Sequence, residues 1–64
     1  MKVERISRND LRQMAVGQTI EFELPSAAKI ESGRVSCSLM KLRGYDFTAI
    51  MNLKKLSLII TRNK

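Results

Sequence analysis

The side chains that most enzymes use for acid–base and nucleophilic chemistry are scarce in this sequence. It contains no histidine, the commonest general base and a frequent metal ligand, and only one cysteine, Cys37. One thiolate is too few for a zinc site built from cysteines, and Gly17, Gly33 and Gly44 do not have the spacing of a phosphate-binding loop. The sequence therefore predicts a protein that is not an enzyme and that holds no metal ion, cofactor or small-molecule substrate.

Cys37 and the pair Glu21 and Glu23 are the remaining groups that could react. Cys37 falls in the middle of a predicted helix, where a cysteine is more typically a small buried hydrophobic residue than a nucleophile. Glu21 and Glu23 are two residues apart in a predicted strand, so both lie on one face and could perform acid–base work together. An open strand face offers no cleft, and we interpret the two carboxylates as solvated surface charges.

The balance of charge is more informative. The 64 residues include 12 lysines and arginines against six acidic residues, which gives a net charge of +6 and an isoelectric point near 10.1. Such a charge attracts polyanions, namely DNA, RNA or an acidic membrane surface. An excess of charge also keeps small domains soluble without serving any partner. Both explanations remain open at this point.

Six residues are predicted to contact nucleic acid. Arg34, Ser38 and Lys41 follow an i, i+4, i+7 spacing that places them on one side of a helix, where cations neutralise phosphates and serine donates to phosphate oxygens. The other predicted contacts lie at a hairpin tip and near the C-terminal end; they are Lys54, Lys55 and Arg62. We expect duplex DNA as the partner, although RNA is not distinguished. Sequence preference should be weak, because no Asn or Gln on the long helix is placed to read a base edge.

Residues typical of helix caps, turns and strand ends divide the chain into the elements that position these side chains. Ser7 is predicted to accept a hydrogen bond from the Asp10 amide and so to begin a short helix that ends at Gly17. Residues 18–24 alternate between apolar and polar and predict a half-buried strand, which Pro25 ends. Residues 1–6 are left undecided between coil and a short strand.

The longest element is a predicted helix over residues 27–42, with Ser26 as its N-cap and Gly44 beyond its end. A stripe of apolar residues within a narrow arc of this helix is predicted to face the core. The stripe consists of Ala28, Val35, Leu39 and Leu42. On this interpretation Gly33 is a mild weakness, which costs up to about 1 kcal/mol relative to alanine.

Residues 45–51 and 56–62 are predicted to form a hairpin with a turn at Asn52. The last strand is apolar on both faces, because Leu58 and Ile60 lie on one face and Ile59 lies on the other. A strand of this kind is expected in the centre of the sheet. The chain is therefore predicted to be a single α+β domain, residues 1–64. A short N-terminal helix precedes a β-α-β-β unit in which one long helix packs on a three-stranded antiparallel sheet of order 1-3-2.

A second apolar stripe lies almost opposite the predicted core stripe of the long helix. Its members are Ile30, Cys37 and Met40. A helix packed on one side should be polar there, so the first helix or a second copy of the chain is expected to cover them. The second case makes these three residues a homodimer interface. It supports an alternative function, that of a small structural or protein-interaction module.

No apolar run approaches the length of a membrane span, and the charged residues 1–12 do not form a signal peptide, so we expect a cytoplasmic protein without a membrane partner.

Several short runs resemble a group of small uncharacterised proteins encoded by phages and mobile elements of gut bacteria. The runs are Asp10-Leu11-Arg12, Val16-Gly17-Gln18, Arg34 with the small helix residues after it, Gly44-Tyr45-Asp46-Phe47 and Ile59-Ile60-Thr61-Arg62. The resemblance covers nearly the whole chain and implies no particular activity. The β-α-β-β order is also similar to small DNA-binding modules of mobile-element recombinases, which is a likeness of fold only.

Overall fold

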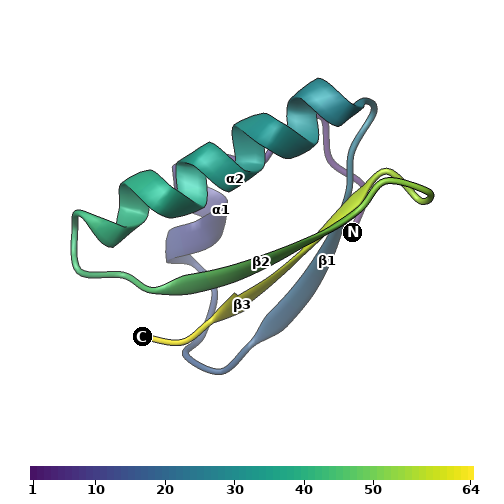
Figure 1. Ribbon diagram of the computed structural model, residues 1–64. Coiled ribbons are helices and arrows are strands. Elements are labelled where there is room, and N and C mark those ends of the chain that lie inside the picture. Colours follow the sequence, from purple (N-terminus) through teal and green to yellow (C-terminus); the bar gives the residue numbers. More distant parts are fainter.

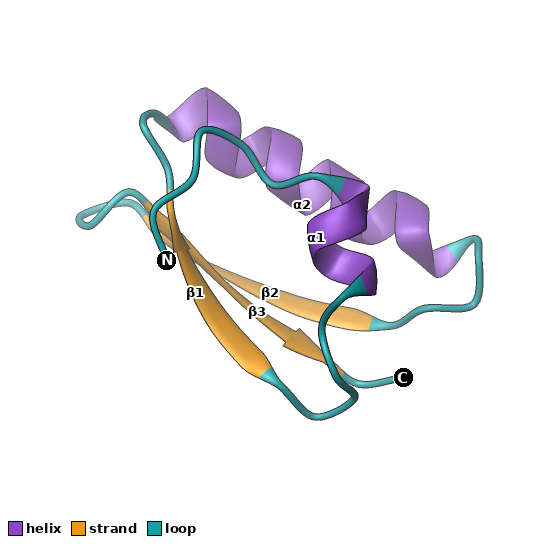
Figure 2. Cartoon of the chain, turned by 180° about the vertical axis from the view of Figure 1, so that it is seen from behind, coloured by secondary structure: helices purple, strands orange, loops and turns teal.

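The computed structural model describes residues 1–64 as two helices and three strands. In chain order the elements are α1 (Arg8–Arg12), β1 (Thr19–Glu23), α2 (Ala27–Lys41), β2 (Phe47–Asn52) and β3 (Ser57–Arg62). The strands form one antiparallel sheet of order β1-β3-β2, and both helices lie on the same side of it (Figures 1 and 2). The predicted α+β fold and its strand order are confirmed.

The alternation of side chains along the strands creates the two faces of the sheet. Phe22 pairs with Leu58 in the β1–β3 ladder, and both are buried beneath the helices together with Ile60. Glu21 and Glu23 point to the opposite face, where the Ser57 hydroxyl donates to the Glu21 carboxylate at 2.9 Å. The period of two therefore places the apolar residues in the core and the acidic ones on the outer face.

The first helix begins as predicted and ends earlier. The Ser7 hydroxyl accepts from the Asp10 amide at 3.1 Å, and the Asp10 carboxylate accepts from the Ser7 amide at 3.0 Å, which completes a capping box. The helix stops at Arg12 rather than near Gly17. Leu11 is fully buried, so this single turn owes its place to packing rather than to helix propensity.

The long helix α2 buries the second apolar stripe, which was expected to be covered by the first helix or by a second copy of the chain, and not the predicted core stripe. Ile30, Gly33, Cys37 and Met40 are buried, whereas Val35, Leu39 and Leu42 are 55%, 40% and 84% exposed. The predicted core stripe of α2 is therefore wrong, and so is the assignment of Ile30, Cys37 and Met40 to an interface between chains. The chain itself covers them, since Leu11, Met14 and Ile6 belong to the same core cluster.

Gly33 explains this rotation of α2. A Cβ atom at this position would lie 2.9 Å from Ile6 Cδ1 and 3.0 Å from Leu58 Cδ2. The missing side chain lets the helix backbone approach both the N-terminal segment and the central strand. The residue that hydropathy treats as a weakness of the helix is thus a point of close packing between α2, the N-terminal segment and β3.

The two edges of the sheet differ. The N-terminal segment runs beside β1: the Val3 amide donates to the Glu23 carbonyl at 3.0 Å, and the Glu23 amide donates to the Met1 carbonyl at 2.7 Å. Lys2 thereby forms an isolated parallel bridge with Glu23, which settles the undecided state of this segment in favour of a short extended pairing. No segment of the chain pairs with the other edge, which is β2.

The hydrogen-bond ladder identifies which groups of β2 face outward. At the C-terminal end of β3, the Arg62 amide donates to the carbonyl oxygen of Gln18, the residue before β1, at 3.0 Å. The next amide, that of Asn63, donates in the other direction, to the carbonyl oxygen of Asp46, the residue before β2, at 2.8 Å. Hydrogen-bonded pairs alternate along an antiparallel ladder. The bonded pairs of β2 and β3 are therefore Thr48–Thr61, Ile50–Ile59 and Asn52–Ser57 in the observed register. The N–H and C=O groups of Phe47, Ala49 and Met51 point away from the sheet.

This alternation predicts a pattern of amide exchange. The amides of Leu58, Ile59 and Ile60 in the central strand should be among the slowest in the protein, because β3 is paired on both sides. Within β2, the amide of Ile50 should exchange much more slowly than those of Ala49 and Met51. Hydrogen exchange followed by NMR measures both. Equal protection of Ala49 and Ile50 would contradict an open β2 edge.

Gly33→Ala tests the close contact of α2. Overpacking a core typically costs about 1–3 kcal/mol, while alanine gains about 1 kcal/mol of helix propensity over glycine. We therefore expect a net loss of about 1 kcal/mol in the free energy of unfolding, measured by urea titration. In an Ile6→Val background, which lacks the nearest methyl group, the same substitution should cost less. A variant more stable than the parent protein would show that the contact does not limit the packing.

Candidate nucleic-acid interface

Three of the six predicted contact residues lie together. Arg34, Ser38 and Lys41 are on the side of α2 that faces the edge of β2. These three side chains line a hollow of about 210 Å³ between α2 and β2. The hollow is also lined by Cys37 of α2 and by Phe47 and Ala49 of β2. The spacing along the helix was therefore sufficient to group these side chains, although the strand that completes the hollow was not foreseen.

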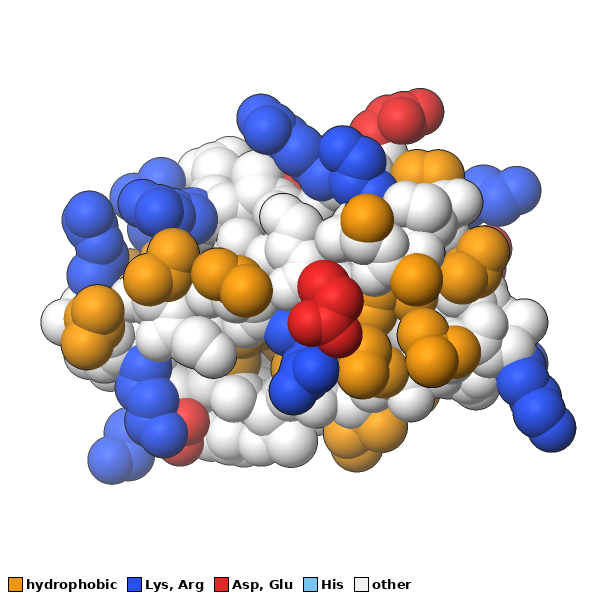
Figure 3. All heavy atoms as spheres, turned by 45° about the horizontal axis from the view of Figure 1, so that its top comes forward, with side chains coloured by type: hydrophobic (Ala, Val, Ile, Leu, Met, Phe, Trp, Pro, Cys, Tyr) orange, Lys and Arg blue, Asp and Glu red, His pale blue; other side chains and the backbone are white.

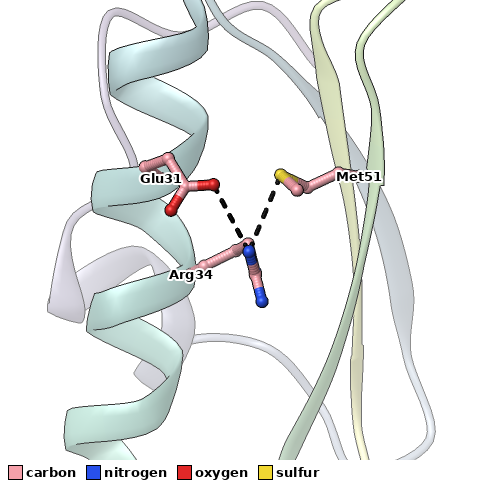
Figure 4. A network of polar contacts seen from close by, with 3 residues as sticks. All are labelled: Glu31, Arg34 and Met51. Atoms are coloured by element: carbon pink, nitrogen blue, oxygen red, sulfur yellow. Dashed lines mark hydrogen bonds and ion pairs between the residues drawn. The ribbon is translucent and has the colours of Figure 1, made fainter.

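Arg34 lies over the gap between α2 and β2 (Figure 4). Its Nη1 atom is 3.3 Å from Oε1 of Glu31, one helical turn earlier, and 4.0 Å from the sulfur of Met51. An exposed ion pair of this kind contributes only about 0.3–0.5 kcal/mol and leaves most guanidinium donors free for another anion. Lys41 makes no ion pair with another side chain, so its charge is also available.

Lys54 and Lys55 lie elsewhere. They occupy the tip of the β2–β3 hairpin, which extends near the N-terminal end of α2, whereas Lys41 is at the other end of that helix (Figure 1). Lys55 lines a separate hollow of about 470 Å³ together with two carboxylate residues, Glu4 and Glu23. The structure thus does not bring the hairpin lysines into one surface with Arg34, Ser38 and Lys41.

Arg62 is engaged inside the fold. Its Nη1 atom donates to the carbonyl oxygen of Arg12, the last residue of α1, at 3.4 Å. The same atom donates to the carbonyl oxygen of Met14, two residues further on. The same guanidinium lies 5.0 Å from the centre of the Tyr45 ring, in a cation–π contact. Arg62 therefore ties the C-terminal end of α1 to β3, and its predicted contact with a phosphate stays a prediction.

Charge is unevenly distributed over the two sides of the sheet. The helical segments 5–12 and 27–43 contain seven cations and two acids, a net +5 out of the total of +6. Both acids are already paired, Asp10 in the capping box and Glu31 with Arg34. The cations are Arg5, Arg8, Arg12, Lys29, Arg34, Lys41 and Arg43. The outer sheet face presents Glu21 and Glu23 instead.

An exposed apolar stripe on α2 is a surface that the sequence interpretation missed. Val35, Leu39 and Leu42 point away from the sheet, and hydrophobic side chains interspersed with Lys and Arg are visible on this side in Figure 3. The i, i+4, i+7 spacing that signals this stripe was recognised but assigned to the core.

Neither helix is long and apolar enough to cross a membrane, and no three side chains of the metal-binding types gather in one place.

Comparisons of the chain with protein-family models, with curated proteins and with solved structures give no match. The similarity to small proteins of phages and mobile elements therefore stays a prediction. Function has to be argued from the surfaces described above.

Cys37 lends itself to a direct chemical test. Burial raises the pKa of its thiol to about 11, so the unreactive protonated form prevails at neutral pH. Alkylation by iodoacetamide at pH 8 should be slow in the native protein and fast in urea, as mass spectrometry can follow. Rapid labelling of the native protein would mean that α2 separates readily from β2.

The same shift predicts a loss of stability at high pH. The thiol ionises near 9.0 when exposed and near 11 when folded, so the folded state holds the proton more tightly over this interval. The free energy of unfolding should therefore fall as the pH rises from about 9 to about 11. In Cys37→Ala, this part of the pH dependence should be absent, which denaturant titrations of both proteins at several pH values would show.

Proposed function

We propose that the protein is a non-enzymatic accessory protein that binds duplex nucleic acid, most readily DNA, through its helical side. The observation that supports this proposal is the segregation of charge, with a net +5 in the helical segments and two glutamates on the outer face of the sheet. A polyanion is attracted to the first side and repelled from the second.

The surface proposed to meet phosphates centres on Arg34, Ser38 and Lys41. The two cations can release counterions from the duplex, and the small hydroxyl side chain between them allows a phosphate oxygen to approach the helix. Lys29 and Arg43 extend the positive surface along the same helix. The hollow of about 210 Å³ offers room for a phosphate group beside β2.

Double-stranded rather than single-stranded nucleic acid is favoured by the state of the aromatic residues. Tyr45 and Phe47 stack on each other with ring centroids 6.1 Å apart, and Arg62 covers Tyr45. Phe22 is buried. No aromatic ring is left to stack on an unpaired base, so the interaction should be dominated by phosphates and carry little sequence preference.

The salt dependence of duplex binding tests the proposal. The logarithm of the association constant should fall linearly with the logarithm of salt concentration, by about 0.9 for each phosphate contact. The double variant Arg34→Ala and Lys41→Ala should flatten that slope by about two units. Fluorescence anisotropy with a labelled duplex at several salt concentrations provides the measurement.

A matched variant separates a defined surface from net charge. Lys2→Ala with Lys64→Ala removes the same two charges from residues outside the helical segments. An equal effect of both double variants would show that no specific surface exists. The absence of any binding at low salt would contradict the proposal outright and leave the positive charge a role in solubility only. A third pair, Lys54→Ala with Lys55→Ala, reports whether the hairpin tip takes part.

A second candidate function, that of a protein-interaction module, is favoured by the exposed stripe Val35, Leu39 and Leu42. Apolar residues in a line on a surface helix are typical of a face that packs against another protein. In this case Leu39→Lys should abolish association while leaving the fold intact, because Leu39 lies outside the core. Sedimentation velocity at several concentrations, with and without a duplex, distinguishes self-association from nucleic-acid binding.

A further inference from the structure

The open edge of β2 is unusual in its composition. Natural edge strands are generally protected from pairing with other chains by charged residues, proline or a bulge. Residues Phe47–Asn52 contain no charge and no proline, and their register with β3 is continuous. At the opposite edge of the same sheet, residues 1–3 pair with the Glu21–Glu23 end of β1. One edge is thus partly covered by the chain itself, while the other is left able to pair.

The backbone groups needed for pairing are in place. Phe47, Ala49 and Met51 direct their N–H and C=O groups away from β3, as the alternation of the ladder requires. This gives one extended partner three residues with which to exchange main-chain hydrogen bonds. In Figure 1 this edge faces the viewer along the whole length of β2, and neither helix crosses it.

Charge above the edge indicates the chemistry of the partner. Arg34 and Lys41 stand on the β2 side of α2, over the hollow that Phe47 and Ala49 line. Of the acidic residues nearby, Glu31 is occupied by Arg34, and Asp46 directly precedes the first residue of β2. A second copy of this chain would add its own Arg34 and Lys41 to the same region, which is repulsive, whereas carboxylates there would be attracted.

We propose that β2 is a docking edge for an extended, acidic segment of a partner protein, which adds to the sheet as a fourth strand. The backbone of the segment pairs with Phe47, Ala49 and Met51, and its carboxylates reach Arg34 and Lys41. Those two cations are seven residues apart, or about 10 Å along α2, and helix-facing positions of a strand recur about every 7 Å. A separation of about 10 Å falls between the roughly 7 Å of strand positions two apart and the roughly 14 Å of positions four apart, and the long Arg, Lys and Glu side chains can span the difference in either case. The interaction shares Arg34 and Lys41 with the nucleic-acid surface proposed above and differs from it in requiring the backbone groups of β2.

The probe is a capped eight-residue peptide in which glutamate and valine alternate. Titration followed by NMR should show chemical-shift changes along β2 and newly slowed exchange of the Ala49 and Met51 amides, with Ile50 slow throughout. A peptide of alternating glutamate and proline has the same charge but cannot form a strand, and it should bind at least about tenfold more weakly. Equal binding of the two peptides would mean that charge alone attracts them and would overturn the proposal.

Removing outward donors tests the edge itself. Ala49→Pro deletes the central outward N–H while the ladder bonds of Thr48 and Ile50 to β3 remain, and it should weaken peptide binding about tenfold or more. Ala49→Val keeps the N–H and should bind normally. If the proline variant fails to fold, a peptide N-methylated at alternate residues makes the same test on the native protein. The peptide N-methylated at the residues whose N–H groups face β2 should bind more weakly, and undiminished binding of that peptide would contradict strand addition.

Two further outcomes are informative. A doubled sedimentation mass without peptide, together with protected Ala49 and Met51 amides, would assign the edge to a second copy and overturn the proposal. Duplex binding is measured on the native protein without peptide and does not require the backbone donors of β2, whereas peptide binding should be lost when the β2-facing residues of the peptide are N-methylated; Arg34→Ala with Lys41→Ala should reduce both. The two proposals can therefore fail independently of each other.

Discussion

The close approach of α2 at Gly33 is the contact on which the remaining surfaces depend. Ile6 and Leu58 occupy the space that a side chain at this position would fill, at 2.9 and 3.0 Å from its Cβ. This contact fixes the rotation of α2 about its axis. With Gly33 toward the sheet, Ile30, Cys37 and Met40 enter the core and Val35, Leu39 and Leu42 face solvent. The same rotation turns Arg34, Ser38 and Lys41 toward β2.

The sheet could be predicted from sequence because its signal is unambiguous. Apolar and polar residues alternate in β1, and Ile59 adds an apolar residue to the second face of β3, so strand order followed from burial alone. The orientation of α2 could not be predicted in this way. Its two opposite stripes are both apolar, so hydropathy does not choose between them. The choice is made by a backbone contact with Ile6 and Leu58, residues that the chain brings together only on folding.

Some features of the candidate site could likewise be predicted from sequence, and others could not. Arg34, Ser38 and Lys41 were grouped correctly because the i, i+4, i+7 relation holds within one helix whichever way the helix is turned. The contacts of Arg62 within the fold could not be predicted, because its partners, the carbonyl oxygens of Arg12 and Met14, lie about 50 residues away in sequence. Lys54 and Lys55 sit on the hairpin as expected, but no local pattern reports that the hairpin points toward the opposite end of α2. The open and uncharged edge of β2 depends on which strand is central, and it becomes visible only once the pairing is known.

Charge and the open edge fit together physically. An unprotected edge strand normally invites two copies of a chain to pair, and β2 has none of the usual protections within its own residues. Here the protection comes from the helix above it, since Arg34 and Lys41 stand beside the edge and repel their counterparts in a second copy. Repulsion of this kind is selective: it disfavours self-pairing and leaves the backbone groups of Phe47, Ala49 and Met51 available to an anionic partner. Under the two proposals, charge concentrated on the helical side acts on both surfaces: it would draw phosphates toward α2 and would determine which strand can join β2.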